Sequence, residues 1–289
     1  MLTIQNLQVS FGTQLALNIS EEIIFEKGDR IGIIGSNGSG KTTLLKSILN
    51  LIPYSGTITS SIPIKDIALH LQENNYTNYV DTKVIIETVL CTKIANDVPL
   101  QELITYFDFD ACLRKKFKQL SGGQKQRMTL ILVLMQNSEI TFFDEVTSGL
   151  DFETRQQLME KLTEWYVKND KTIAIVSHYY EELEQLANKI LILDKGVVLA
   201  FGKTTDLFTR YCGFSVITIL SKDTLPHMPS TFRMLASPSH LKAFSCSNSA
   251  EERAITDYFI THNINFNRSN CDLEIMFINI KDQEGCNHA

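Results

Sequence analysis

The residues of this sequence best suited to chemistry form a glycine-rich loop between a short apolar run and a helical pattern. Residues 35–42 read Gly-Ser-Asn-Gly-Ser-Gly-Lys-Thr and fit the pattern G-x-x-x-x-G-K-[ST]. Glycines let backbone N–H groups converge on phosphate oxygens, and the N-terminus of the following helix adds a partial positive charge. In this motif the lysine, here Lys41, reaches the β- and γ-phosphates, and the hydroxyl, here Thr42, ligates Mg²⁺. The residues expected to contact a nucleotide are Gly35, Ser36, Asn37, Gly38, Ser39, Gly40, Lys41, Thr42 and Thr43.

An acidic pair at the end of an apolar strand pattern forms a second candidate site. Residues 140–143 are Ile-Thr-Phe-Phe, and Asp144 and Glu145 follow them directly. In a parallel sheet this position lies beside the phosphate loop, where Asp144 can hold Mg²⁺ directly or through water. Glu145 is then placed to orient an attacking water or to accept its proton. Alone, such a pair is an ordinary solvated strand end, but beside a phosphate loop it indicates hydrolysis.

The third candidate is the run Leu-Ser-Gly-Gly-Gln at residues 120–124, at the start of a helical stretch. Because Ser121 opens that helix, its hydroxyl and the following amide groups are donors suited to a phosphate. The chain therefore contains two separate stretches that can each contact phosphate.

These three motifs, in this order, resemble the ATP-binding cassette (ABC) ATPase family, over about residues 1–210. Residues 120–124 match the family's signature without a substitution. The resemblance implies that Gln72 senses and ligates Mg²⁺, that His178 holds the attacking water, and that Phe11 stacks on adenine. The implied catalytic set is therefore Gln72, Glu145 and His178, with Thr42, Gln72 and Asp144 around the metal. The implied D-loop consists of Ser148, Gly149, Leu150 and Asp151.

The resemblance also implies a dimer. In this family the signature lies far from its own phosphate loop and caps the nucleotide held by a second ABC subunit. Two chains, in a homodimer or a heterodimer, then bury two ATP molecules between them, and we expect ATP and Mg²⁺ as cofactors. ATP binding is expected to close the dimer and hydrolysis to reopen it. The residues expected to act on the partner's nucleotide are Leu120, Ser121, Gly122, Gly123 and Gln124.

Alternating strand and helix patterns after residue 121 predict an α/β fold with a largely parallel, mixed sheet flanked by helices. We expect a P-loop NTPase core with an antiparallel β subdomain and a helical subdomain at about residues 76–136. The nucleotide-binding domain is predicted to span residues 1–210, and a small α+β accessory domain residues 211–289. In the accessory domain the patterns predict a helix at 250–261 and strands at 216–220, 232–235 and 273–280.

Composition narrows the possible partners. The 289 residues carry a formal net charge of −6, which argues against a nucleic-acid binder. Six cysteines lack a C-x-x-C pair, so we expect reduced thiols in a cytosolic protein. The longest apolar run, residues 130–135, is far shorter than a membrane span, and no export signal is visible at the N-terminus.

The expected function is ATP hydrolysis in a membrane ABC transporter whose permease subunits are separate chains. Such a subunit lies at the cytoplasmic face of the membrane, bound through the permease. Residues 37–44 and the single-cassette layout resemble the bacterial group that exports drugs or antimicrobial peptides. Three alternatives remain: an importer subunit with a regulatory C-terminal domain, a soluble ABC protein outside transport, and a regulatory module without turnover. The complete catalytic set argues against the last.

Overall fold

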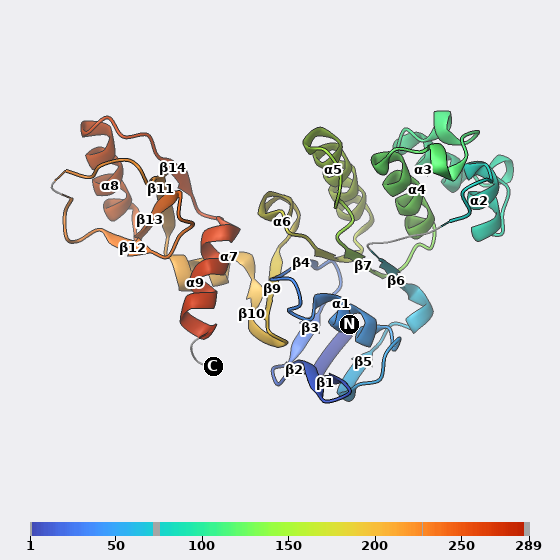
Figure 1. Ribbon diagram of the computed structural model, residues 1–289, viewed down its shortest axis with the longest axis horizontal. Helices are drawn as coiled ribbons and strands as arrows, with labels where there is room; N and C mark the ends of the chain where they lie inside the picture. Colours follow the sequence, from blue (N-terminus) through green and yellow to red (C-terminus); the bar gives the residue numbers. More distant parts are fainter. Residues whose placement is uncertain (1, 72–75, 227, 286–289) are drawn as a thin grey trace.

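The computed structural model describes residues 2–71, 76–226 and 228–285, which form a central body with a lobe on either side (Figure 1). Helices α2, α3 and α4 build one lobe, and a small sheet with helix α8 builds the other. Within these residues, no helix has both the length and the apolar character needed to cross a membrane.

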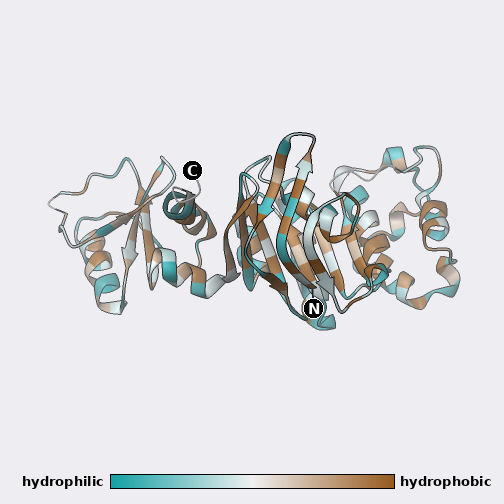
Figure 2. Ribbon diagram, turned by 90° about the horizontal axis from the view of Figure 1, so that it is seen from below, coloured by the Kyte–Doolittle hydropathy of each residue, from teal (hydrophilic) through white to brown (hydrophobic). Residues whose placement is uncertain are grey.

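A six-stranded sheet in the order β10-β9-β4-β8-β7-β6 forms the centre of the body. All neighbours pair in parallel except β9 and β10, which form a hairpin. The parallel strands are apolar almost throughout, as expected of strands covered on both faces. Figure 2 shows hydrophobic residues on the strands of the central body. The strands are β4 (Arg30–Gly35), β6 (Ile67–His70), β7 (Ile140–Asp144), β8 (Thr172–Val176), β9 (Lys189–Asp194) and β10 (Val197–Lys203).

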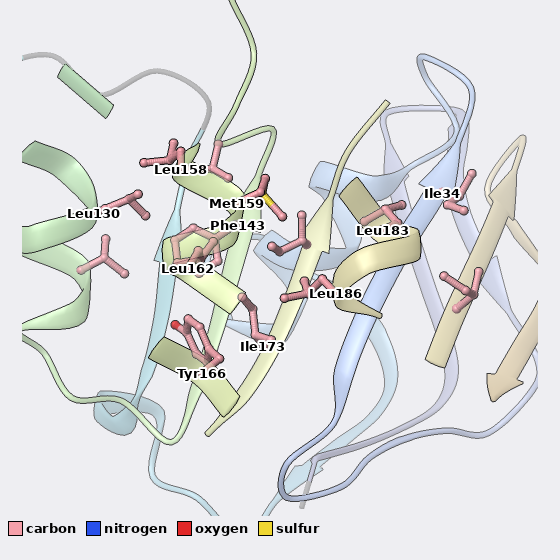
Figure 3. Packing of buried hydrophobic residues seen from close by; sticks show 14 of the residues in the cluster. Ile34, Leu130, Phe143, Leu158, Met159, Leu162, Tyr166, Ile173, Leu183 and Leu186 are labelled. Atoms are coloured by element: carbon pink, nitrogen blue, oxygen red, sulfur yellow. The ribbon is translucent and has the colours of Figure 1, made fainter. Parts of the chain in front are cut away.

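The two faces of this sheet bury different partners. Successive side chains of a strand point to opposite faces, so Ile173 and Ile175 belong to the core shared with α5 (Phe152–Asn169) and α6 (Tyr180–Leu186). Figure 3 shows Ile173 beside residues of these two helices. Ala174 and Val176 belong instead to the core shared with α1 (Lys41–Ile48) and the N-terminal strands. These strands are β1 (Leu2–Phe11), β2 (Gln14–Ile19), β3 (Ile23–Phe25) and β5 (Ser55–Ser60), and β1 pairs antiparallel with the other three.

Two of the three α-helices in the described part of the helical lobe start with a side-chain cap. The Asp97 side chain accepts a hydrogen bond from the Leu100 amide at the start of α3, and Ser121 caps α4 in the same way. Residues 128–134 of α4 are all buried and connect the lobe to the central sheet. The bounds are α2 (Thr82–Val89), α3 (Val98–Tyr106) and α4 (Gly122–Leu134), with single 3₁₀ turns at Ile64–Asp66, Ile94–Asn96, Asp110–Cys112 and Phe117–Gln119.

The C-terminal lobe is an antiparallel sheet in the order β12-β13-β11-β14, with α8 packed on it. It has a small core of its own, in which Ile217, Phe244 and Phe259 are fully buried. Helix α7 leads into it from the central body. The bounds are α7 (Thr204–Cys212), β11 (Ser215–Leu220), β12 (Arg233–Leu235), β13 (Leu241–Cys246), α8 (Ser249–Thr261) and β14 (Asn267–Ser269).

One predicted strand is wrong: residues 273–280 belong to a helix, α9 (Leu273–Gly285). The Asp272 carboxylate accepts a hydrogen bond of 2.9 Å from the Ile275 amide and starts the helix. Leu273, Met276 and Ile280 follow at helical spacing and are fully buried. Their partners lie in α6, α7, β9 and β10, so α9 returns from the small lobe and packs against the central body.

The start of α9 is fixed by Glu184 of α6, whose carboxylate accepts a hydrogen bond of 2.8 Å from the Leu273 amide. Loss of hydration against α9, together with the nearby carboxylates of Asp272, Glu181 and Glu274, raises the pKa of Glu184 from 4.5 to about 7.

We predict that this contact makes stability depend on pH. The folded chain binds an extra proton between the unfolded pKa of 4.5 and the folded pKa of about 7. The free energy of unfolding should therefore fall as pH rises across this window. Urea denaturation at several pH values measures this dependence. The free energy of unfolding should fall less steeply with pH in Glu184→Gln than in the wild type, because glutamine keeps an acceptor oxygen but cannot ionise. Equal slopes in the two proteins would contradict this assignment.

Candidate active site

The phosphate loop connects the end of β4 to the start of α1, as the glycine motif predicts. Gly38 and Gly40 have φ values of +79° and +102°, which side chains other than glycine rarely adopt. A Cβ at Gly40 would also lie 2.5 Å from Leu17 Cδ2 of the neighbouring strand. The loop conformation therefore depends on glycine at these two positions.

Lys41 folds back over this loop. Its Nζ donates hydrogen bonds of 2.7 Å to the Gly35 carbonyl and 3.1 Å to the Ser36 carbonyl. Burial lowers the pKa of Lys41, while the carboxylates of Glu145 and Asp144 raise it. A buried ammonium held over a ring of backbone amides is suited to binding phosphate oxygens.

Thr42 and Asp144 form the second part of the site. The Thr42 hydroxyl donates a hydrogen bond of 2.7 Å to Asp144 Oδ2, although the two residues are far apart in sequence. Burial raises the pKa of Asp144, and the bond from Thr42 lowers it. A hydroxyl and a carboxylate are the hard oxygen donors that Mg²⁺ prefers. Among the described residues, no group of three or more His, Cys, Asp or Glu is arranged to hold a metal.

Glu145 and His178 meet at the ends of β7 and β8. Glu145 Oε1 lies 2.9 Å from His178 Nε2, and both side chains are partly exposed. Glu145 has a φ of +52°, and its amide donates a hydrogen bond of 3.0 Å to the Val176 carbonyl of β8. The turn thus directs the carboxylate away from the strand and toward the histidine. Such a pair can hold a water molecule and accept its proton.

Lys41, Thr42, Glu145 and His178 line one cavity of about 660 Å³. Residues 37–43 form one wall, Glu145 and His178 another, and Lys195 and residues 14–16 of β2 the third. Sequence reasoning missed the third wall because nothing in β2 or in the β9–β10 turn forms a recognisable motif. Phe11 lies at the end of β1, 53% exposed, and pairs with Gln14 across the turn. It is not among the described residues that line the cavity, so adenine stacking by Phe11 remains a prediction.

The role predicted for Gln72 also remains a prediction, since this residue lies outside the described ranges. The strand before it, β6, runs parallel to β7 and pairs His70 with Phe143.

The signature is not brought to this cavity within the chain: no residue from 120 to 124 is among its described lining residues. Ser121 and Gln124 form a reciprocal cap at the start of α4, with bonds of 3.3 Å and 3.2 Å. A Cβ at Gly123 would lie 2.7 Å from Thr154 Cγ2 at the start of α5. The glycine therefore lets α4 and α5 approach closely.

The predicted D-loop lies beside the signature. Asp151 caps α5 by accepting hydrogen bonds from the Thr154 amide, at 3.0 Å, and the Thr154 hydroxyl, at 2.8 Å. A Cβ at Gly122 would come within 3.7 Å of Leu150 Cδ2, which shows how near the two segments are. Ser148 and Gly149 complete the turn from Glu145.

A buried carboxylate that sequence reasoning missed connects the catalytic loops. Glu182 of α6 is 6% exposed and accepts hydrogen bonds of 2.6 Å from the Ser177 hydroxyl and 3.0 Å from the Thr147 hydroxyl. Arg155 forms an ion pair with it at 3.4 Å and stacks on the Tyr179 ring at 3.6 Å. Burial raises the pKa of Glu182, and these partners lower it. Ser177 directly precedes His178 and Thr147 directly precedes Ser148, so Glu182 fixes both loops.

Comparison with known proteins shows which proteins this chain resembles. Residues 20–148 match the family model described as ABC transporter. The Nod factor export ATP-binding protein I of Burkholderia lata is 29% identical over 79% of this chain and 78% of its own length. The methionine import ATP-binding protein MetN of Clostridium tetani is 27% identical over 92% of this chain and 86% of its own length. The linearmycin resistance ATP-binding protein LnrL of Bacillus subtilis is 28% identical over 76% of this chain and 74% of its own length.

Solved structures show the same fold. A structure of the ATP-binding subunit of an ABC transporter has a TM-score of 0.64 at 20% identity, and covers 73% of this chain and 92% of its own. A dimeric post-hydrolysis state of the ATP-binding cassette MJ0796, bound to ADP and Pi, has a TM-score of 0.60 at 23% identity. The match covers 70% of this chain and 98% of that one. The predicted resemblance to ATPase subunits of ABC transporters is therefore confirmed, and so is the predicted P-loop fold class.

We predict that Glu182 is essential for stability. Glu182→Leu leaves Arg155 unpaired and two hydroxyls without an acceptor, which should lower the free energy of unfolding by about 2–4 kcal/mol. The matched control is Glu181→Leu at the exposed neighbouring position, for which we expect a change within about 0.5 kcal/mol. Urea denaturation measures both, and similar losses in the two variants would contradict the assignment.

Proposed function

We propose that this chain is the ATP-hydrolysing subunit of a membrane transporter and works with separate permease subunits. The observation that carries the proposal is the contact of 2.9 Å between Glu145 and His178, in the same cavity as Lys41. A phosphate-binding loop alone would serve for binding. A carboxylate and an imidazole at its open side provide for hydrolysis as well.

Each part of the site has a role in this proposal. Lys41 and the loop amides bind the phosphates, and Thr42 and Asp144 would hold Mg²⁺, which would supply positive charge to the phosphates when bound. Glu145 orients the attacking water and accepts its proton, while His178 holds the carboxylate and the water in line with the γ-phosphate. Gln72 is proposed to complete the metal site, and Phe11 to contact adenine.

We further propose that the transporter exports peptides or drugs. Similarity to the linearmycin resistance and Nod factor export proteins supports this direction. Import is the second candidate, favoured by the methionine import protein of Clostridium tetani, because a match over 92% of this chain must extend into the C-terminal lobe. Co-purification with a membrane permease but no extracellular binding protein would support export. A binding protein in the complex would support import.

The helical lobe is our proposed docking site for the permease, which places the chain peripherally at the cytoplasmic face of the membrane. We also propose that ATP is sandwiched between two chains. Ser121 and its neighbouring amides are exposed donors that lie apart from the cavity of their own chain, so a second subunit is needed to bring them to a nucleotide.

We predict that Glu145→Gln lowers ATP turnover at least about a hundredfold, because one preorganised catalytic group contributes about 3–4 kcal/mol to the barrier. Binding of ATP should persist, whereas Lys41→Ala should weaken it. Phosphate release and equilibrium ATP binding measure the two effects. The control is Glu139→Gln, just before the opposite end of the same strand. Unchanged turnover in Glu145→Gln would overturn the proposed mechanism.

The trans arrangement predicts that Ser121→Ala loses turnover but binds ATP normally in the isolated chain. Loss of a helix cap alone costs about 1 kcal/mol, and Asn248→Ala, which removes the cap of α8, controls for this. The control should retain turnover. Equal turnover in the two variants would contradict a role for the signature in hydrolysis.

Mixing two inactive variants tests the same arrangement directly. A dimer of one Lys41→Ala chain and one Ser121→Ala chain contains one site with both defects and one intact site. Turnover should therefore recover to about half of the wild-type value per mixed dimer. Failure to recover would show that the two residues do not act across an interface between copies of this chain.

A further inference from the structure

The last helix of the chain, α9, reaches the phosphate loop. It lies against β9 and β10 at the side of the central sheet that faces the C-terminal lobe (Figure 1). Its Phe277 forms one wall of a small cavity of about 110 Å³. The other walls include Gly35 and Ser36 of the phosphate loop and His178 at the end of β8. A segment of the C-terminal part of the chain is thus a direct neighbour of the candidate active site.

A buried carboxylate connects α9 to the loop. Lys281 Nζ donates a hydrogen bond of 3.0 Å to Asp194 Oδ1, and the Ser36 hydroxyl donates one of 3.1 Å to the same oxygen. Asp194 is 6% exposed and ends β9, directly after Leu193, which pairs with Gly35. The Ser36 hydroxyl and the Lys281 ammonium are therefore both hydrogen-bonded to the same carboxylate oxygen.

Lys281 is itself held in place by the packing of α9. The Phe277 ring, one helical turn earlier, lies 6.1 Å from the ring of Tyr180, which opens α6 two residues after His178. Ile280 beside it is fully buried against the body. The Leu273 amide at the start of α9 is bonded to α6. The position of the Lys281 ammonium is thus fixed by the helix as a whole.

We propose that Lys281 is a positioning residue for ATP binding, acting through Asp194 on Ser36; this inference rests on the proposed function. A buried carboxylate without a counter-charge, one hydrogen bond from the phosphate loop, opposes the binding of a polyanion. Lys281 supplies the counter-charge and leaves Asp194 free to orient the loop. Because α9 follows directly on the small lobe, movement of that lobe changes the affinity of the loop for ATP.

Equilibrium binding of Mg·ATP to the full chain tests the proposal without relying on turnover. We expect Lys281→Gln to bind ATP about fivefold more weakly, as for the loss of one partly buried ion pair. Lys281→Arg keeps the charge and should restore most of the affinity. The matched control is Lys222→Gln, an exposed lysine just after β11 in the small lobe, which should bind like the wild type.

A second background separates action through Asp194 from a general effect of charge. In Asp194→Asn chains a neutral amide replaces the carboxylate, so no charge needs to be balanced. Adding Lys281→Gln should therefore change ATP binding less than twofold. A fivefold loss in both backgrounds would overturn the proposed path through Asp194.

The outcomes also separate this inference from the proposed function. If the wild type binds ATP and Lys281→Gln matches Lys222→Gln, the positioning role of Lys281 is wrong and the ATPase assignment stands. If the wild type binds ATP, Lys281→Gln weakens it, and no chain hydrolyses ATP even with its permease, the inference holds and the proposed hydrolysis fails. A wild type that binds no ATP would overturn both.

Discussion

The parallel pairing of β4, β8 and β7 is the constraint on which the candidate active site depends. Gly32 pairs with Ile175, and Ile175 with Phe143, so the three strands end at one edge of the sheet. The phosphate loop, the acidic pair and His178 each lie at or just after the end of one of these strands. Residues more than a hundred positions apart, such as Thr42 and Asp144, therefore meet within hydrogen-bond distance.

Three buried carboxylates then fix the loops that leave this edge. Asp144 holds Thr42 at the start of α1, Glu182 holds the segments before the D-loop and before the histidine, and Asp194 holds Ser36. A carboxylate in a poorly hydrated position is stable only when it is bonded and balanced by charge. Each loop is therefore specified by a partner on a different element, and a disturbance of one element reaches the nucleotide site.

The sequence predicted those elements whose pattern is unambiguous. The predicted strands at residues 140–143 and 216–220 and the predicted helix at residues 250–261 lie within one residue of the observed bounds of β7, β11 and α8. Helix α9 was predicted as a strand because Leu273, Ile275 and Phe277 also lie at alternating positions. Tertiary packing favours the helix, because one face of α9 carries the residues that are buried against α6, α7 and the β9–β10 hairpin.

The sequence by itself determined the chemistry: the glycine loop, its lysine and threonine, the acidic pair and the signature are local patterns, and each needs only its own neighbours to be recognised. The tertiary structure alone decided which residues share the site. Glu182, Asp194 and Lys281 belong to no motif, because their roles arise from contacts between elements distant in sequence. The same reason explains the place of the signature. The residues of the motif indicate that it can bind phosphate, whereas its separation from the phosphate loop of the same chain is a property of the fold.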